Sequence, residues 1–303
     1  PDSYRAMLAI GGNYRAQFSP KLIGVTGSVG KTTTKEFCYA VLSAFGTALK
    51  TEGNQNNELG LPNTLLRLEP ATEYGVVEMG MSHAGEISRL TRCAKPAAGI
   101  ITCIGVSHME NLGSRENILK AKLEICEGLP EGAPLALNRD DEYLRGAKLP
   151  AHVRPVWYSL ADQTADVFAG SIQAGADSTF FVLEDAANGS FAVKLPAIGR
   201  HNVYNALAAY AAATRLGLDA AKAAAALERI EAGDPVHPIY QAIRESADTA
   251  REIREATMHA LAEDAVARAN AMKKGKKPKP RLKPVTSDDA LPVQYPVRAF
   301  VQT

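Results

Sequence analysis

The stretch TGSVGKTTTKEF, residues 26–37, constrains the fold more than any other part of the sequence. It follows the short apolar run KLIGV and precedes a segment whose apolar residues recur at the spacing of one helix face. A strand, a glycine loop and a helix in this order form the setting in which backbone N–H groups hold phosphate oxygens. The stretch therefore predicts a phosphate-binding loop, which we favour over a chance glycine turn before a helix.

Each residue type in the loop has a chemical task. Gly27 and Gly30 let the backbone turn tightly around a phosphate, Lys31 can reach the β- and γ-phosphates, and the Thr32 hydroxyl can ligate Mg²⁺. The pattern G-x-x-x-x-G-K-[ST] fails, because Val25 occupies the first glycine position, and this departure indicates a subclass of such loops. The predicted nucleotide-binding residues of the loop are Gly27, Ser28, Val29, Gly30, Lys31, Thr32 and Thr33.

Composition narrows the protein class. The 303 residues with 46% hydrophobic content can bury one large core or two smaller ones. The four cysteines show no metal-ligand spacing and are typical of reduced thiols, and no signal peptide or apolar stretch of roughly 20 residues is present. We therefore expect a cytoplasmic protein without a membrane span.

The net charge of +1 hides an asymmetry. Seven basic residues between positions 273 and 283 stand without an acid among them. Leaving these seven aside, 27 basic residues face 33 acidic ones, so the body of the chain carries a charge of −6. A general nucleic-acid-binding role is therefore not expected for the body.

The order of elements predicts an α/β fold. Short apolar runs alternate with helical patterns from residue 21 to about 149, which indicates a mostly parallel sheet with helices on both faces. The runs VFAGSIQA, STFFVLED and SFAVKLP then predict a small antiparallel meander, followed by two Ala-rich helices. We divide the chain into a linker or helix remnant (1–20), a nucleotide-binding domain (21–231), and a charged helix with a Lys/Pro-rich, partly disordered tail (232–303).

Polar side chains follow two of the predicted strands. Glu78 stands at the carboxyl end of a strand, where ligands gather in parallel sheets, so it is a candidate Mg²⁺ ligand. The alternative is the start of a solvated loop. His108 lies just past another strand and, taken singly, reads as an ordinary loop histidine.

Lys122 is the strongest anomaly. On a predicted helix beginning near Ser114, it falls within the apolar stripe between Ile118 and Ile125. A buried lysine costs several kcal/mol unless it is paired or chemically altered. The alternative is a lysine whose ammonium reaches water past the helix edge.

A third polar cluster consists of His201, Asn202 and Asn205, whose spacing places them along one side of an otherwise Ala-rich helix. The alternative is helix capping by Asn202, with the other two side chains solvated.

Several motifs in order resemble the Mur ligases, ATP-dependent amide-forming enzymes of peptidoglycan synthesis. They are VTGSVGKTTTKE, EGNQNNELGLPNTLL, EMGMSHAGEI, SHMENLGSRENILKAKLEI and GRHNVYNALAAYAAA. All but the first resemble the MurF branch in particular, and the likeness covers about residues 20–230. The resemblance implies the Mur ligase central-domain fold and ATP and Mg²⁺ as cofactors.

Carried over by position, the resemblance implies a role for each candidate residue. Lys31 and the loop amides would bind the ATP phosphates, while Thr32 and Glu78 would hold one Mg²⁺. His108 would serve a second Mg²⁺ together with Lys122, which matches a lysine that family members carbamylate. Lys31, His108 and Lys122 form the predicted catalytic set. The residues expected near the adenine are His201, Asn202 and Asn205, and those expected on the approach to the acyl substrate are Asn54, Asn56 and Asn57.

The implied reaction joins D-alanyl-D-alanine to UDP-N-acetylmuramoyl tripeptide through an acyl phosphate, in a protein we expect to be a monomer. Two alternatives stand beside it. One is a sister-branch ligase similar to folylpolyglutamate synthetase. The other is a non-catalytic ATP-binding domain whose Lys-rich tail binds an acidic partner or an anionic membrane surface.

The chain also departs from the MurF pattern. Only twenty residues precede Lys21, and no D-x-Y-N-x-x-P motif follows residue 230. From these departures we expect the central ATP-binding part of such an enzyme, which would not ligate at a useful rate on its own.

Overall fold

The computed structural model describes residues 3–229. The predicted charged helix and Lys/Pro-rich tail at 232–303 lie outside the described residues. Within residues 3–229, no helix combines the length and apolar character that crossing a membrane requires.

The framework is a nine-stranded sheet with the order β2-β3-β1-β4-β5-β6-β7-β8-β9. Pairing is parallel from β2 through β7 and antiparallel from β7 to β9. The strands are β1 (Lys21–Thr26), β2 (Ala48–Lys50), β3 (Tyr74–Glu78), β4 (Ala98–Ile101), β5 (Ala133–Asn138), β6 (Val153–Ser159), β7 (Val167–Ala174), β8 (Thr179–Asp185) and β9 (Gly189–Leu195). The predicted mostly parallel sheet with an antiparallel meander is confirmed.

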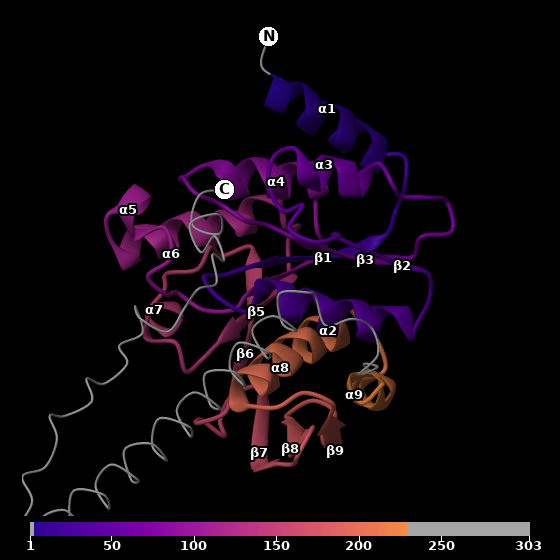
Figure 1. Cartoon of the computed structure of the whole chain (residues 1–303), viewed down its shortest axis with the longest axis vertical. Helices are drawn as coiled ribbons and strands as arrows, with labels where there is room; N and C mark the ends of the chain where they lie inside the picture. The colour runs from indigo at the N-terminus through magenta and orange to yellow at the C-terminus, as the bar shows by residue number, and fades with distance from the viewer. Residues whose placement is uncertain (1–2, 230–303) are drawn as a thin grey trace, which may run out of the picture. The chain divides into compact units, whose positions relative to one another are not determined.

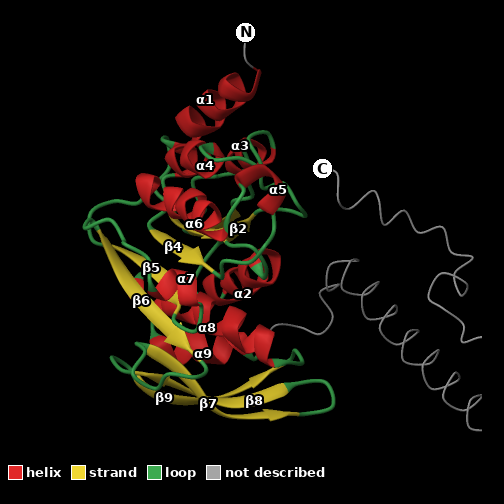
Figure 2. Cartoon of the chain, turned by 90° about the vertical axis from the view of Figure 1, so that its left-hand side faces the viewer, coloured by secondary structure: helices red, strands yellow, loops and turns green. Residues whose placement is uncertain are grey.

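Helices cover both faces of this sheet (Figure 1). α2 (Lys31–Ser43), α8 (Arg200–Arg215) and α9 (Ala220–Leu227) lie on one face. The other carries α1 (Ser3–Arg15), α3 (Gly60–Leu65), α4 (Glu86–Ala94) and α6 (Arg115–Leu123). The short elements are α5 (Met109–Leu112), the 3₁₀ turn η1 (Glu124–Gly128) and α7 (Glu142–Arg145). The meander β7–β9 extends the sheet at the end farthest from α1 (Figure 2).

The sheet separates two hydrophobic cores. One joins the sheet to α2, α8 and α9, and every residue of α8 from Ala206 to Ala213 is fully buried there. Small alanine side chains allow the helix to approach the sheet and α2 closely on several sides. The second core lies on the opposite face and includes Ile118 and Ile125 from the α6–η1 segment.

Three details differ from the sequence prediction. The strands β2 and β6 were not predicted, because β2 has only three residues and β6 carries Arg154 and Pro155 in its first half. The helix expected to begin near Ser114 ends at Leu123, where the backbone tightens into η1. Residues 3–15 form a complete helix, which packs on α3 and α4.

Candidate active site

The predicted phosphate loop lies between β1 and α2, and contacts with neighbouring residues fix its position. Gly27 and Gly30 have φ of 145° and 84°, in the region that favours glycine. A Cβ at Gly27 would lie 1.8 Å from Thr102 Oγ1. The Ser28 N–H donates to the Cys103 carbonyl at 2.9 Å, and Thr102 Oγ1 donates to the Val29 carbonyl at 2.5 Å. Residues 102 and 103, which follow β4, therefore hold the loop through hydrogen bonds.

Lys31 is the first residue of α2 and folds back over the loop. Its Nζ donates to the Gly27 carbonyl at 2.9 Å and to the Ser28 carbonyl at 3.5 Å. Burial lowers the pKa of Lys31, while the nearby negative charge of Glu78 opposes that shift. The ammonium thus stands at the loop, within electrostatic reach of the Glu78 carboxylate.

Glu78 is the last residue of β3, and only one of its two carboxylate oxygens accepts a hydrogen bond from the described residues. The residue is buried, and Oε1 accepts a hydrogen bond from Asn56 Nδ2 at 2.9 Å. Among residues 3–229, Oε2 has no hydrogen-bond partner, and Lys35 Nζ lies 3.9 Å from it. A buried carboxylate oxygen without a donor is costly unless a ligand completes it. The structure therefore disfavours the solvated-loop alternative for Glu78.

The donor set around the loop fits a phosphate-bound Mg²⁺. No cluster of three or more His, Cys, Asp or Glu side chains that could hold a metal occurs in residues 3–229. Mg²⁺ at nucleotide sites uses one or two carboxylates, with substrate phosphates and water completing the octahedron. Glu78 Oε2 supplies such a carboxylate oxygen, and half-buried Thr32 stands in the first turn of α2.

Lys122 is a buried residue of α6. The residue is 1% exposed, so the alternative in which its ammonium reaches open water is wrong. Burial and then the positive charge of Lys31 lower the pKa of Lys122 to about 7. At neutral pH a large fraction of this side chain is therefore a neutral amine, which can act as a nucleophile.

His108 is influenced by the charges of Lys122 and Lys31. It is half-buried, has φ of 64°, and directly precedes α5. Burial lowers the pKa of His108, and the charges of Lys122 and Lys31 lower it further. The imidazole is accordingly neutral near pH 7, the form that can ligate a metal. The structure thus brings Lys31, His108 and Lys122 within electrostatic reach of one another.

The three asparagines of residues 52–57 have different surroundings. Asn56 bonds Glu78, and its carbonyl accepts from the Gly80 N–H at 2.8 Å. Asn57 Oδ1 accepts from the N–H groups of Leu59 and Gly60, so this side chain organises the start of α3. Asn54 is exposed. Among the three, Asn56 is the side chain that joins this loop to the metal-site candidate.

The three polar residues of α8, His201, Asn202 and Asn205, also have different surroundings. Asn205 is buried, and its Oδ1 accepts from Thr34 Oγ1 at 3.1 Å. The same oxygen lies 2.7 Å from where a Cβ on Gly30 would be. Asn205 therefore supports the phosphate loop. His201 is exposed, and half-buried Asn202 donates to the Ile198 carbonyl at 2.9 Å rather than capping α8, whose N-cap is Gly199.

Two supporting residues were missed in the sequence. Thr102 was missed because a threonine after a strand carries no signal of its own. Lys35 was detectable, since it precedes buried Cys38 by three residues and Leu42 by seven on the apolar face of α2. The test that singled out Lys122 would have found Lys35 as well.

Comparisons with known proteins agree with this fold. A model of the Mur ligase middle domain matches residues 25–213. The UDP-N-acetylmuramoyl-tripeptide--D-alanyl-D-alanine ligase of Bacillus subtilis is 40% identical over 236 residues, which cover 75% of this chain and 49% of that protein. The chain belongs to the Mur ligase family, as the sequence motifs indicated.

Solved structures give the same result. A crystal structure of MurF from Acinetobacter baumannii matches with a TM-score of 0.72 at 34% identity, covering 77% of this chain and 51% of that one. MurF ligase from Thermotoga maritima, in complex with ADP, matches with a TM-score of 0.68 at 30% identity, covering 75% and 52%. The chain therefore spans about half the length of the relatives that it matches.

Proposed function

We propose that this chain carries the ATP-binding and phosphoryl-transfer part of a MurF-type amide ligase. Such an enzyme would join UDP-N-acetylmuramoyl tripeptide to D-alanyl-D-alanine through an acyl phosphate. The observation that carries the proposal is the convergence of Lys31, Glu78, His108 and Lys122 around one phosphate loop. The sister-branch alternative is less favoured, because the relatives at 40% identity are MurF ligases.

The chain's own residues have defined tasks in this reaction. The loop amides and Lys31 bind the β- and γ-phosphates and neutralise charge as the phosphoryl group moves to the substrate carboxylate. Glu78 Oε2 and the Thr32 hydroxyl would hold one Mg²⁺, and His108 would hold a second. Bound Mg²⁺ would neutralise phosphate charge and orient the transferred group.

Lys122 would join the metal site only after a change of chemistry. Its neutral amine attacks CO₂, forming an N–C bond and releasing one proton, which leaves a carbamate anion on the side chain. A buried cation becomes an oxygen ligand for a hard metal. The lowered pKa and the absence of any ion-pair or hydrogen-bond partner for Lys122 within residues 3–229 support this step.

The remaining roles follow from position. We place the adenine near His201 and Asn202 at the start of α8, with Asn205 supporting the loop from the same helix. Asn54 and Asn56 would face the acyl substrate.

The four cysteines are unpaired, which fits a reducing cytoplasm. The expected monomeric state stays a prediction that light scattering can test.

The deciding experiment supplies ATP, Mg²⁺, UDP-N-acetylmuramoyl tripeptide and D-alanyl-D-alanine. ADP release that depends on the tripeptide, with or without a pentapeptide product detected by mass spectrometry, would support the proposal. Release that depends instead on a folate and glutamate would favour the sister branch. Absence of any Mg²⁺-dependent nucleotide binding in calorimetry would overturn both.

A further inference from the structure

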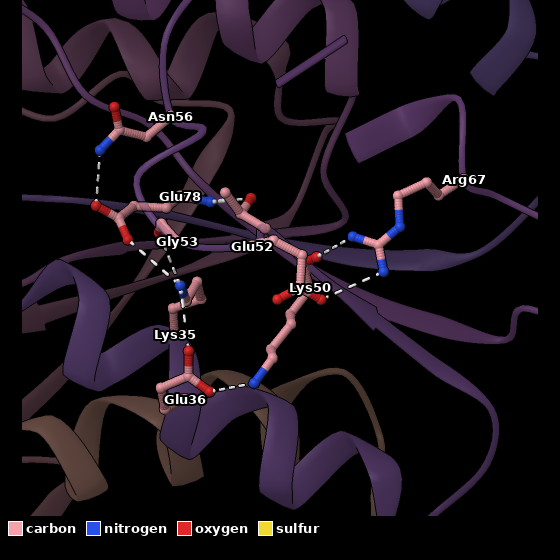
Figure 3. A network of polar contacts seen from close by, with 9 residues as sticks. Lys35, Glu36, Lys50, Glu52, Gly53, Asn56, Arg67 and Glu78 are labelled. Carbon is pink, nitrogen blue, oxygen red and sulfur yellow. Dashed lines mark hydrogen bonds and ion pairs between the residues drawn. The ribbon is translucent and has the colours of Figure 1, made fainter. Parts of the chain in front are cut away.

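A second buried lysine, Lys35, occupies the centre of a polar network beneath the 52–57 loop (Figure 3). Lys35 lies one helical turn after Lys31 on α2, and its side chain is 1% exposed. Burial of an ammonium carries a large desolvation cost that only well-placed partners offset. The contacts of Lys35 therefore show what this charge does in the fold.

The ammonium of Lys35 contacts its neighbour Glu36 on α2 and two segments outside this helix. Nζ donates to the Gly53 carbonyl at 3.3 Å, pairs with Glu36 Oε1 at 3.2 Å, and lies 3.9 Å from Glu78 Oε2. Gly53 belongs to the 52–57 loop, and Glu78 ends β3. One side chain of α2 thus reaches the candidate acyl-substrate loop and the candidate metal ligand together (Figure 3).

The far side of the loop is fixed by contacts that do not involve the Lys35 ammonium directly. Asn56 Nδ2 donates to Glu78 Oε1, and the Gly80 N–H donates to the Asn56 carbonyl. A Cβ at Gly80 would lie 2.7 Å from Asn56 Oδ1, so the loop packs tightly on the end of β3. At the near side, Gly53 is exposed and its carbonyl is held by Lys35.

We infer that Lys35 is a positioning residue, whose ammonium holds the 52–57 loop in register with Glu78. The 3.9 Å separation is too long for a hydrogen bond, so Lys35 compensates the charge of Glu78 without occupying Oε2. That oxygen stays available to a ligand. The identity of the ligand on the loop, an acyl substrate bearing a carboxylate, rests on the proposed function.

The test measures amide hydrogen exchange in the full chain without ligands. Substituting Lys35 alone would leave Glu78 buried and uncompensated, which could unfold the protein for a different reason. We therefore compare Glu78→Gln with the double variant Lys35→Met/Glu78→Gln, because neither contains an unpaired carboxylate at position 78. Amides 53–57 should exchange at least about tenfold faster in the double variant, while those of β3 and the rest of α2 stay unchanged.

Lys50→Met is the matched control. The Lys50 ammonium pairs with the same Glu36 carboxylate at 2.6 Å and lies over the Tyr39 ring, and both of these residues belong to α2. Its removal should change the exchange of amides 53–57 less than twofold. Equal exchange in the two Glu78→Gln backgrounds, or equal acceleration by Lys50→Met, would overturn the inference.

A binding experiment separates positioning from simple loss of stability. In the Glu78→Gln background, Lys35→Met should weaken binding of UDP-N-acetylmuramoyl tripeptide at least fivefold, with ADP affinity measured without Mg²⁺ changing less than twofold. Equal losses for both ligands would contradict a role at the loop. If the unchanged protein binds ADP but not the tripeptide, the substrate assignment fails, and the exchange comparison still decides the role of Lys35.

Discussion

The two buried lysines of this domain, Lys35 on α2 and Lys122 on α6, differ in their surroundings. Each is 1% exposed. Lys35 is surrounded by two carboxylates and a carbonyl oxygen, whereas Lys122 has no ion pair or hydrogen bond among the residues that the structure describes, and the cation Lys31 acts on it. Burial alone therefore does not determine what a lysine does, because neighbouring charges decide between a compensated ammonium and a reactive amine.

The largest expected effect concerns Lys122, the lysine proposed to react. Lys122→Met should reduce substrate-dependent ATP cleavage at least about a hundredfold, because the second metal position would lose its anionic ligand. ADP affinity without Mg²⁺ should change less than threefold, since the phosphate loop is untouched. Lys120→Met, an exposed lysine on the same helix, is the control and should retain activity. Full activity in Lys122→Met would remove the catalytic assignment.

The next effect concerns the cation that lowers the pKa of Lys122. Lys31→Ala should weaken Mg²⁺–ATP binding at least tenfold in calorimetry, because it removes the charge directed at the β- and γ-phosphates. The same change should raise the pKa of Lys122, since the positive charge of Lys31 helps to lower it. Unchanged nucleotide affinity in Lys31→Ala would show that the loop does not bind phosphate as proposed.

The pH dependence of carbamylation sharpens the contrast between the two lysines. Only the neutral amine reacts with CO₂, and a pKa of about 7 makes the neutral fraction of Lys122 rise about tenfold between pH 6 and pH 8. At a fixed concentration of dissolved ¹³CO₂, the carbamate signal in ¹³C NMR should grow at least that much. Lys122→Met should remove the signal. A carbamate signal that persists in Lys122→Met and vanishes in Lys35→Met would show that Lys35 is the reactive amine.

The smallest effect is on stability. Below pH 7 folded Lys122 is a buried cation, so its burial penalty is complete, and this penalty declines as the pH rises from about 7 toward 10.5. In CO₂-free buffer, Lys122→Met should therefore exceed the unchanged protein in unfolding free energy by more at pH 6 than at pH 8. We expect a difference of about 1 kcal/mol between the two pH values. A pH-independent difference in denaturant unfolding would contradict the lowered pKa.

The amino-acid sequence by itself predicted the glycine loop between β1 and α2, the mostly parallel sheet and the anomaly at Lys122. Each of these features is local: glycine spacing, alternation of short apolar runs, or the position of one charge in a helical stripe. Family motifs added the expected roles of Glu78 and His108, which single residues after strands do not specify. The motifs also indicated the Mur ligase family, which the comparisons confirmed.

Only the tertiary structure decided which groups meet. The bonds from Asn56 to Glu78 and from Thr102 to Val29 join residues 22 and 73 positions apart, and the contact from Lys35 reaches a loop 18 positions away. Periodicity along one element indicates which face is buried, but not which charges the opposing elements present to that face. The electrostatic difference between Lys35 and Lys122 arises from those opposing charges, so it became visible only when the sheet, α2 and α6 were placed together.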